Sequence, residues 1–144
     1  MRSGIGFLIS LVLLIASGCR APQAQTPSWS TTPSGLGIRE LVQGEGPSPR
    51  PGQTCVVYAK GWIEEQGSQG RAFLDTRKRG FPDIFPVGVG RVIKGWDEGL
   101  ATMKKGGRRL LRVPPSLGYS SAELGSTIPP GATLLFELEL TEIR

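Results

Sequence analysis

The apolar and polar positions near the C-terminus alternate with the period of a β-strand. Residues 132–143 read ATLLFELELTEI, in which every second residue from Leu134 to Leu140 is large and apolar and the residues between them are mostly polar. Successive side chains of a strand point to opposite faces, so one set is expected to face a core and the other to face water. The inward set is Leu134, Phe136, Leu138 and Leu140, and the outward set is Glu137, Glu139 and Thr141.

Two further segments have strand character, and one has the period of a helix. Residues 54–63 and 110–113 are rich in β-branched and other apolar residues. Residues 95–105 place Trp96, Leu100 and Met103 three or four apart, and Gly106-Gly107 follows as a stop signal. One short helix among several strands, with 21 glycines and 12 prolines between the segments, predicts an α+β fold. The natural arrangement is an antiparallel sheet curled around the helix, which covers its apolar face.

The first residues have the pattern of a secretion signal. An apolar run over residues 6–16 follows Arg2 and is too short to span a bilayer as a mature helix. It ends in Ala16-Ser-Gly-Cys19, which resembles a lipobox, so residues 1–18 are predicted to be a lipoprotein signal peptide and Cys19 to be lipidated. Simple secretion and an uncleaved anchor are the alternatives. Arg20 is not the aspartate associated with inner-membrane retention, so an outer-membrane anchor is favoured for a Gram-negative source.

Composition divides the rest of the chain into a tether and one domain. Residues 19–35 are rich in Pro, Ser, Thr and Gln without hydrophobic periodicity and are predicted to form a flexible tether. Residues 36–144 are predicted to form a single domain. If Cys19 is acylated, Cys55 has no partner for an intramolecular disulfide and is expected to be a small buried apolar residue.

The residue inventory excludes several kinds of chemistry. The chain has no histidine and two cysteines, which excludes zinc clusters, Cys/His pairs and Ser-His-Asp triads. We expect neither a metal nor a cofactor. The net charge of +5 is carried by short basic runs, which are typical of a solvated surface, so no nucleic-acid partner is expected.

Five segments, in order and at matching spacing, resemble the FKBP family of peptidyl-prolyl isomerases. They are residues 52–57 (GQTCVV), 73–76 (FLDT), 89–100 (VGRVIKGWDEGL), 114–119 (PPSLGY) and 128–136 (IPPGATLLF). The resemblance covers residues 36–144. It implies a half-barrel of antiparallel strands around one short helix, with a shallow apolar pocket that accepts the proline of an Xaa-Pro bond.

The reaction that the resemblance implies is rotation about a peptide bond. The uncatalysed barrier is about 18–20 kcal/mol because amide resonance is lost in the twisted state. Neither a nucleophile nor a metal is needed, which agrees with a chain that lacks histidine. An apolar pocket lowers the barrier by removing water from the carbonyl group and by binding the twisted amide preferentially.

The resemblance assigns roles to individual residues. It implies that Trp96 forms the pocket floor, that the Ile93 N–H and the Tyr119 hydroxyl bind substrate carbonyl groups, and that Asp75 lies beside the bound amide. The structural alternatives are a core aromatic for Trp96, packing for Tyr119, and a turn or helix cap for Asp75. The substrate-binding positions that it implies are Val92, Phe85, Phe73, Leu74, Ala59, Ile128 and Phe136.

The chain departs from the family pattern at several pocket positions. Ala59 stands in place of a usual tyrosine, and Asp83 in place of a usual aromatic residue. Leu74 stands where an aromatic directly precedes the aspartate, with Phe73 one residue earlier, and either lines the pocket if a bulge changes the register. The loop 120–127 lacks the usual glycine after the tyrosine. These changes are expected to alter the catalytic rate and inhibitor affinity rather than the fold.

The leading hypothesis is therefore an extracytoplasmic isomerase, attached to a membrane through Cys19, that acts on secreted or envelope proteins. The alternative is a peptide-binding module or holdase that uses the same groove without useful catalysis. The expected partners are proline-containing polypeptides, the lipid bilayer and macrolide inhibitors of the FKBP type. No segment resembles the helical dimerisation segment of some family members, so a monomer is expected.

Overall fold

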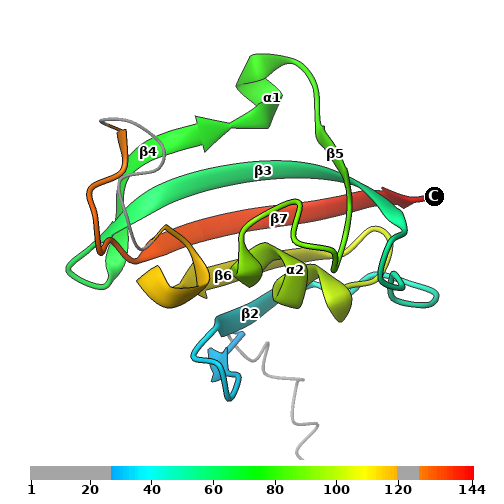
Figure 1. Cartoon of the computed structure of the whole chain (residues 1–144), viewed down its shortest axis with the longest axis horizontal. Coiled ribbons are helices and arrows are strands. Elements are labelled where there is room, and N and C mark those ends of the chain that lie inside the picture. The colour runs from blue at the N-terminus through cyan, green and yellow to red at the C-terminus, as the bar shows by residue number, and fades with distance from the viewer. Residues whose placement is uncertain (1–26, 120–126) are drawn as a thin grey trace, which may run out of the picture.

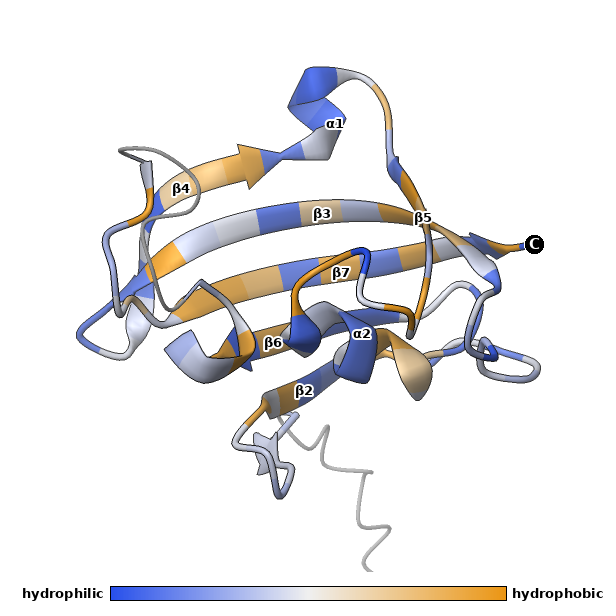
Figure 2. Cartoon of the chain, in the orientation of Figure 1, coloured by the Kyte–Doolittle hydropathy of each residue, from blue (hydrophilic) through white to orange (hydrophobic). Residues whose placement is uncertain are grey.

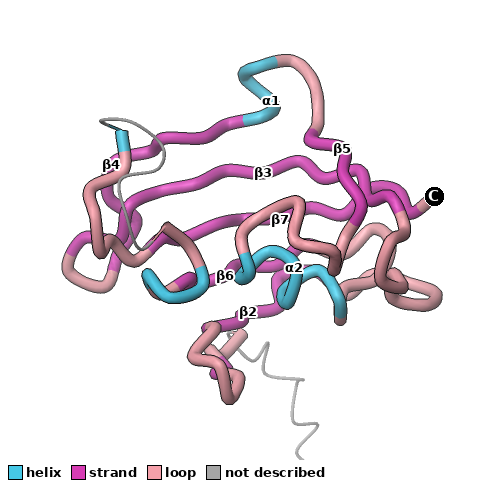
Figure 3. The backbone as a smooth tube through the Cα atoms, viewed as in Figure 1, coloured by secondary structure: helices cyan, strands magenta, loops and turns pink. Residues whose placement is uncertain are grey.

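The computed structural model describes residues 27–119 and 127–144. The predicted signal peptide, Cys19 and most of the loop 120–127 lie outside the described residues. Sheet and loop account for most of the described chain, and the helices are few and short (Figure 3). Among the described residues, no helix is long and apolar enough to cross a membrane.

The strands form one antiparallel sheet. Its strands are β1 (Ser30–Thr31), β2 (Gly37–Val42), β3 (Thr54–Glu65), β4 (Ser68–Asp75), β5 (Asp83–Pro86), β6 (Arg108–Val113) and β7 (Leu134–Ile143). Their order is β1-β2-β6-β7-β3-β4, and β5 pairs with β3. The helices are α1 (Thr76–Arg79), α2 (Lys94–Ala101) and the 3₁₀ turn η1 (Pro115–Leu117). The sheet curves around α2, which lies over one face (Figure 1), and this confirms the predicted α+β half-barrel.

The alternation predicted for the C-terminal strand is confirmed. Leu134, Leu138 and Leu140 are fully buried, and Phe136 is 2% exposed. Figure 2 shows hydrophobic and hydrophilic residues alternating along β7. Cys55 on β3 is also fully buried, as predicted, and burial raises the pKa of its thiol.

The helix α2 is shorter than predicted. It ends at Ala101, and Thr102 is its C-cap, so Met103 is buried in the core from the turn that follows. Gly106-Gly107 does not end the helix; the Gly106 N–H instead donates to Leu140 O at 2.7 Å. The buried Arg109 explains the early end, because its guanidinium donates to Gly99 O at 2.7 Å and to Thr102 Oγ1 at 2.6 Å. A cation at this end also favours the helix dipole.

Two glycines let α2 lie against β6. A Cβ added at Gly95 would lie 2.8 Å from Val113 Cγ1, and one added at Gly99 would lie 2.5 Å from Leu111 Cδ1. Glycine lowers helix propensity by about 1 kcal/mol relative to alanine. Burial of Trp96 and Leu100 against the sheet offsets that cost.

The paired part of the chain begins within the segment predicted to be a tether. Ser30 and Thr31 of β1 pair with Ile38 and Gly37 of β2. The Arg39 guanidinium donates to Pro27 O at 2.6 Å and lies over the Trp29 ring. Residues 27–35 therefore pack against the domain, which shortens the stretch available as a free tether.

Candidate functional site

A cavity of about 980 Å³ opens beside the N-terminal end of α2. Its walls come from β4, β5, the loop before α2, η1 and β7, so the curvature of the sheet brings together segments that are distant in sequence. All but two of the predicted site residues line it: Phe73, Leu74, Phe85, Val92, Ile93, Trp96, Tyr119, Ile128 and Phe136.

Aromatic side chains form the inner part of the cavity. Trp96 is 6% exposed, and its ring centroid lies 5.3 Å from that of Phe136 and 5.8 Å from that of Phe85. Phe73 meets Phe136 edge to face at 5.6 Å. Such edge contacts are favoured by the ring quadrupoles. The inner surface of the cavity is therefore largely aromatic.

Gly61 on β3 makes room for this aromatic cluster. A Cβ at this position would lie 2.8 Å from Phe73 Cζ and 2.9 Å from Phe136 Cε1. The pairing of β3 with β4 changes register between Gly61 and Trp62, where Leu74 and Ala72 are the partners. This irregularity allows Phe73 and Leu74, which are neighbours in sequence, both to line the cavity.

The loop before α2 is held by a carboxylate. Asp97, in the first turn, accepts hydrogen bonds from the N–H groups of Gly88 at 2.8 Å and Gly90 at 3.0 Å. Ile93 O caps the helix by accepting from the N–H groups of Trp96 and Asp97. The Ile93 N–H makes no hydrogen bond to any of the described residues. It is thus available to a ligand in the cavity.

Tyr119 contributes a second donor. The residue follows η1 and is half-buried at the cavity wall, and its hydroxyl makes no hydrogen bond to the described residues. Burial raises the pKa of Tyr119 above its ordinary value of 10.0. The hydroxyl therefore stays protonated at neutral pH and can donate to a carbonyl oxygen.

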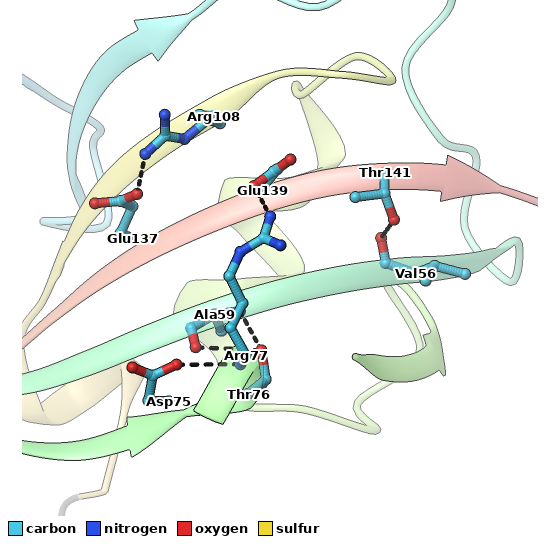
Figure 4. A network of polar contacts seen from close by, with 9 residues as sticks. All are labelled: Val56, Ala59, Asp75, Thr76, Arg77, Arg108, Glu137, Glu139 and Thr141. Atoms are coloured by element: carbon cyan, nitrogen blue, oxygen red, sulfur yellow. Dashed lines mark hydrogen bonds and ion pairs between the residues drawn. The ribbon is translucent and has the colours of Figure 1, made fainter. Parts of the chain in front are cut away.

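Asp75 does not line the cavity in this structure. It is the N-cap of α1, and its carboxylate accepts from the N–H groups of Arg77 and Lys78 at 3.1 Å each. Figure 4 shows the first of these contacts. The helix-cap alternative considered from the sequence thus describes the hydrogen bonds that this side chain makes. The cap lies at the end of β4, directly after Phe73 and Leu74.

Ala59 is the other predicted residue outside the cavity lining. It is 3% exposed, and its N–H donates to Thr76 Oγ1 at 2.9 Å while its carbonyl accepts from the same hydroxyl at 3.3 Å. Thr76 is itself fully buried. The backbone of Ala59 is thus covered by the start of α1.

Asp83, which the sequence marked as a departure at a pocket position, lies at the cavity wall and forms an ion pair with Arg79 at 2.5 Å. The structure also adds cavity residues that the sequence did not single out. They are Ile84, Gly90, Arg91, Lys94, Ser116, Gly118 and Thr127. An acidic residue near the start of the predicted helix, seven residues after a Gly-x-Gly sequence, was the available sequence signal for the role of Asp97. No pattern in the sequence around Gly61 indicated that this residue makes room for Phe73 and Phe136.

The face of the sheet away from α2 carries a separate polar network. The Arg77 guanidinium pairs with Glu139, and Arg108 pairs with Glu137 (Figure 4). Arg77 also lies 4.2 Å from the centroid of the Tyr58 ring. These partners are partly exposed, so the pairs contribute little to stability. Within residues 27–119 and 127–144, no group of three or more cysteine or acidic side chains is placed to hold a metal ion.

Comparisons with known proteins agree with this geometry. The family model for FKBP-type peptidyl-prolyl cis-trans isomerases matches residues 46–141. A Neisseria meningitidis serogroup B protein named FK506-binding protein is 43% identical over 109 residues, which cover 76% of this chain and 96% of that protein.

Two crystal structures are similar throughout the domain. AtFKBP13 superposes with a TM-score of 0.73 at 37% identity, covering 81% of this chain and 99% of that one. FkpA from Escherichia coli superposes with a TM-score of 0.72 at 36% identity. The match covers 81% of this chain and 51% of the FkpA chain, so this chain corresponds to about half of that protein.

Proposed function

This chain belongs to the FKBP-type peptidyl-prolyl cis-trans isomerase family, and we propose that the aromatic cavity beside α2 is its catalytic site. Members of the family are isomerases that bind proline-containing peptides and ligands of the FK506 type. In this chain, residues of the cavity catalyse the rotation, and the substrates are Xaa-Pro bonds in secreted or envelope proteins.

The observation that carries the proposal is an apolar aromatic cavity bordered by two donors. The Ile93 N–H and the Tyr119 hydroxyl both border it, and neither has a partner among the described residues. Trp96 supplies a floor against which a proline ring packs. The two donors then hold carbonyl groups of the peptide on either side of the rotating bond.

This arrangement lowers the barrier in two ways. The apolar walls exclude water, which stabilises the planar dipolar amide more than the twisted one. Carbonyl groups held in the twisted geometry contribute binding energy that is realised only in the transition state. Each 1.4 kcal/mol of such preference accelerates rotation about tenfold.

Walls of the site come from the residues predicted as substrate-binding, with the exception of Ala59. They are Val92, Phe85, Phe73, Leu74, Ile128 and Phe136. We assign Asp75 a positioning role, because its Oδ1 accepts both hydrogen bonds of the α1 cap. In that role it holds the end of β4, which carries Phe73 and Leu74.

The test is the cis-to-trans rate of a Leu-Pro peptide, measured with residues 27–144. This fragment keeps β1. The match covers 96% of the Neisseria protein, so that protein consists of little more than this domain. We expect acceleration well above the uncatalysed rate, a reduction of about tenfold in Tyr119→Phe, and a larger one in Trp96→Leu. Folding of each variant is checked by circular dichroism.

A specific result would favour the alternative function. Peptide binding without acceleration would show a binding module or holdase on the same fold. The exchange of the usual tyrosine and aromatic residue for Ala59 and Asp83 would then explain the loss of catalysis. Loss of both binding and acceleration in folded protein would overturn the assignment of the cavity.

We further propose that the protein is a monomeric lipoprotein attached to the outer face of a cell membrane or to an outer membrane. The support is the sequence of residues 1–19, with Cys19 as the acylated residue. Because Pro27 onward packs on the domain, only residues 20–26 remain as a tether, which extends to about 25 Å at most. Cys19→Ser should release the protein from the membrane fraction, and light scattering of residues 27–144 should give the mass of one chain.

A further inference from the structure

Basic side chains surround the mouth of the cavity. Arg91 and Lys94 line it and are exposed, and they lie on either side of Val92 and Ile93. Arg71 adds a third cation at the same mouth, because its guanidinium donates to the carbonyl of Thr127, another lining residue, at 2.6 Å. Neither Arg91 nor Lys94 forms an ion pair with any described residue.

The acidic groups nearby are already engaged. Asp83, at the cavity wall, is paired with Arg79, so that pair adds no net charge. The Asp97 carboxylate accepts from Gly88 and Gly90, and the Asp75 carboxylate accepts from the first turn of α1. Hydrogen bonds from neutral N–H groups leave the charges of Asp97 and Asp75 in place, but neither carboxylate lines the cavity. Among the described lining residues, the charge without an ionic partner is therefore positive.

We infer that the site selects proline segments with an aspartate or glutamate next to the proline. This inference rests on the proposed catalytic site and names its substrate class. Lys94 directly follows Ile93, whose N–H binds a peptide carbonyl in the proposed function. A substrate held there places the side chains that flank its proline close to Lys94 and Arg91. An acidic side chain then gains an attraction that a neutral one of the same shape does not.

The size of the effect follows from exposed charges in water. Two opposite charges about 6–8 Å apart attract weakly at high dielectric, which corresponds to a preference of about two- to threefold per cation. The preference is screened by salt, because the Debye length falls from about 30 Å at 0.01 M to about 3 Å at 1 M. We expect a combined preference of about fivefold at low ionic strength.

The test compares matched peptides on residues 27–144. Glutamate and glutamine are placed in otherwise identical peptides, directly before the proline in one pair and directly after it in the other. The measured quantity is the ratio of kcat/KM for glutamate to that for glutamine. It is determined at low and high salt in the unchanged fragment and in Arg91→Gln/Lys94→Gln.

A matched control removes the same charge elsewhere. Lys104→Gln/Lys105→Gln changes two exposed lysines that follow α2 and do not line the cavity. We expect a ratio of about five in at least one pair, in both the unchanged fragment and the control. The ratio should fall towards one in Arg91→Gln/Lys94→Gln and in 1 M salt.

The outcomes separate this inference from the proposed function. A ratio of one in both pairs, with glutamine peptides still accelerated, overturns the inference and leaves the isomerase intact. A ratio that survives Arg91→Gln/Lys94→Gln also overturns it, because the selectivity then arises elsewhere. Absence of acceleration for every peptide in folded protein rejects the proposed function itself.

Discussion

The Gly90 N–H donates to the Asp97 carboxylate at 3.0 Å, and this contact ties the loop before α2 to the first turn of the helix. Gly90 has a φ of +76°, a left-handed conformation that glycine adopts without strain. The same carboxylate accepts from Gly88 at 2.8 Å. Ile93 lies three residues after Gly90, so the position of the proposed Ile93 donor depends on an acidic side chain on the helix.

Replacement of Asp97 should leave the Ile93 N–H less firmly positioned. We expect Asp97→Ala to lower kcat/KM for a Leu-Pro peptide by about five- to tenfold, because two charge-assisted hydrogen bonds are lost. Glu98→Ala is the matched control, since its carboxylate accepts from Ser34 and does not line the cavity. Equal rates for the two variants would show that the loop keeps its shape without Asp97.

The two roles considered for Asp75 can be separated by the choice of replacement. Asparagine keeps the capping oxygen and removes the charge, whereas alanine removes both. We expect Asp75→Asn to stay within a few tenths of a kcal/mol of the unchanged protein and to retain activity. Asp75→Ala should lose about 1 kcal/mol of unfolding free energy. Urea unfolding and the Leu-Pro rate measure the two effects.

An inactive but stable Asp75→Asn would reverse the assignment. It would show that the carboxylate charge acts on the bound amide, as the family resemblance implies, in addition to the cap.

Gly61 should tolerate no side chain. A methyl group there would collide with Phe73 and Phe136, so Gly61→Ala is expected to displace Phe73 and to cost about 1–3 kcal/mol of stability. Peptide affinity should fall with it, because both rings line the cavity. Titration with a proline peptide, followed by Trp96 fluorescence, measures this loss.

A second substitution tests the cause. Phe73→Leu shortens the side chain that the methyl group meets, so adding it to Gly61→Ala should restore part of the stability. A double variant as unstable as the sum of the two single ones would show that the collision lies elsewhere.

The activity that depends on Tyr119 should be insensitive to pH over the physiological range. Burial raises the pKa of this phenol, so the neutral form is favoured in the folded state. The resulting stabilisation is fully present below about pH 10 and is lost as the pH rises through the folded pKa. The rate ratio between the unchanged protein and Tyr119→Phe should therefore stay constant from about pH 6 to pH 9. A ratio that falls within that range would mean that the hydroxyl is not the donor.

Periodicity and motif spacing predicted most of the architecture. The alternation from Leu134 to Leu140 and the spacing of Trp96 and Leu100 are local properties, and burial of one face is enough to produce them. The motif segments also predicted most of the cavity lining, because the order of strands and loops in this fold brings those segments together.

The remaining features depended on contacts between distant segments. Arg109, a strand residue, ends α2 at Ala101 by donating to the Gly99 carbonyl and the Thr102 hydroxyl, and no pattern within 95–105 contains that information. Thr76 covers Ala59, and Gly61 accommodates Phe73, only because β3 and β4 pair in one particular register.

By itself, the sequence determined the fold class, the family and the segments that line the site, because these follow from local apolar periods and short motifs. Only the tertiary structure decided that Asp75 caps α1, that β1 belongs to the sheet and that the cavity mouth is positively charged. The physical reason is that hydrogen-bond partners and neighbouring charges are set by distances in space. Those distances exist only after the sheet has curved around the helix.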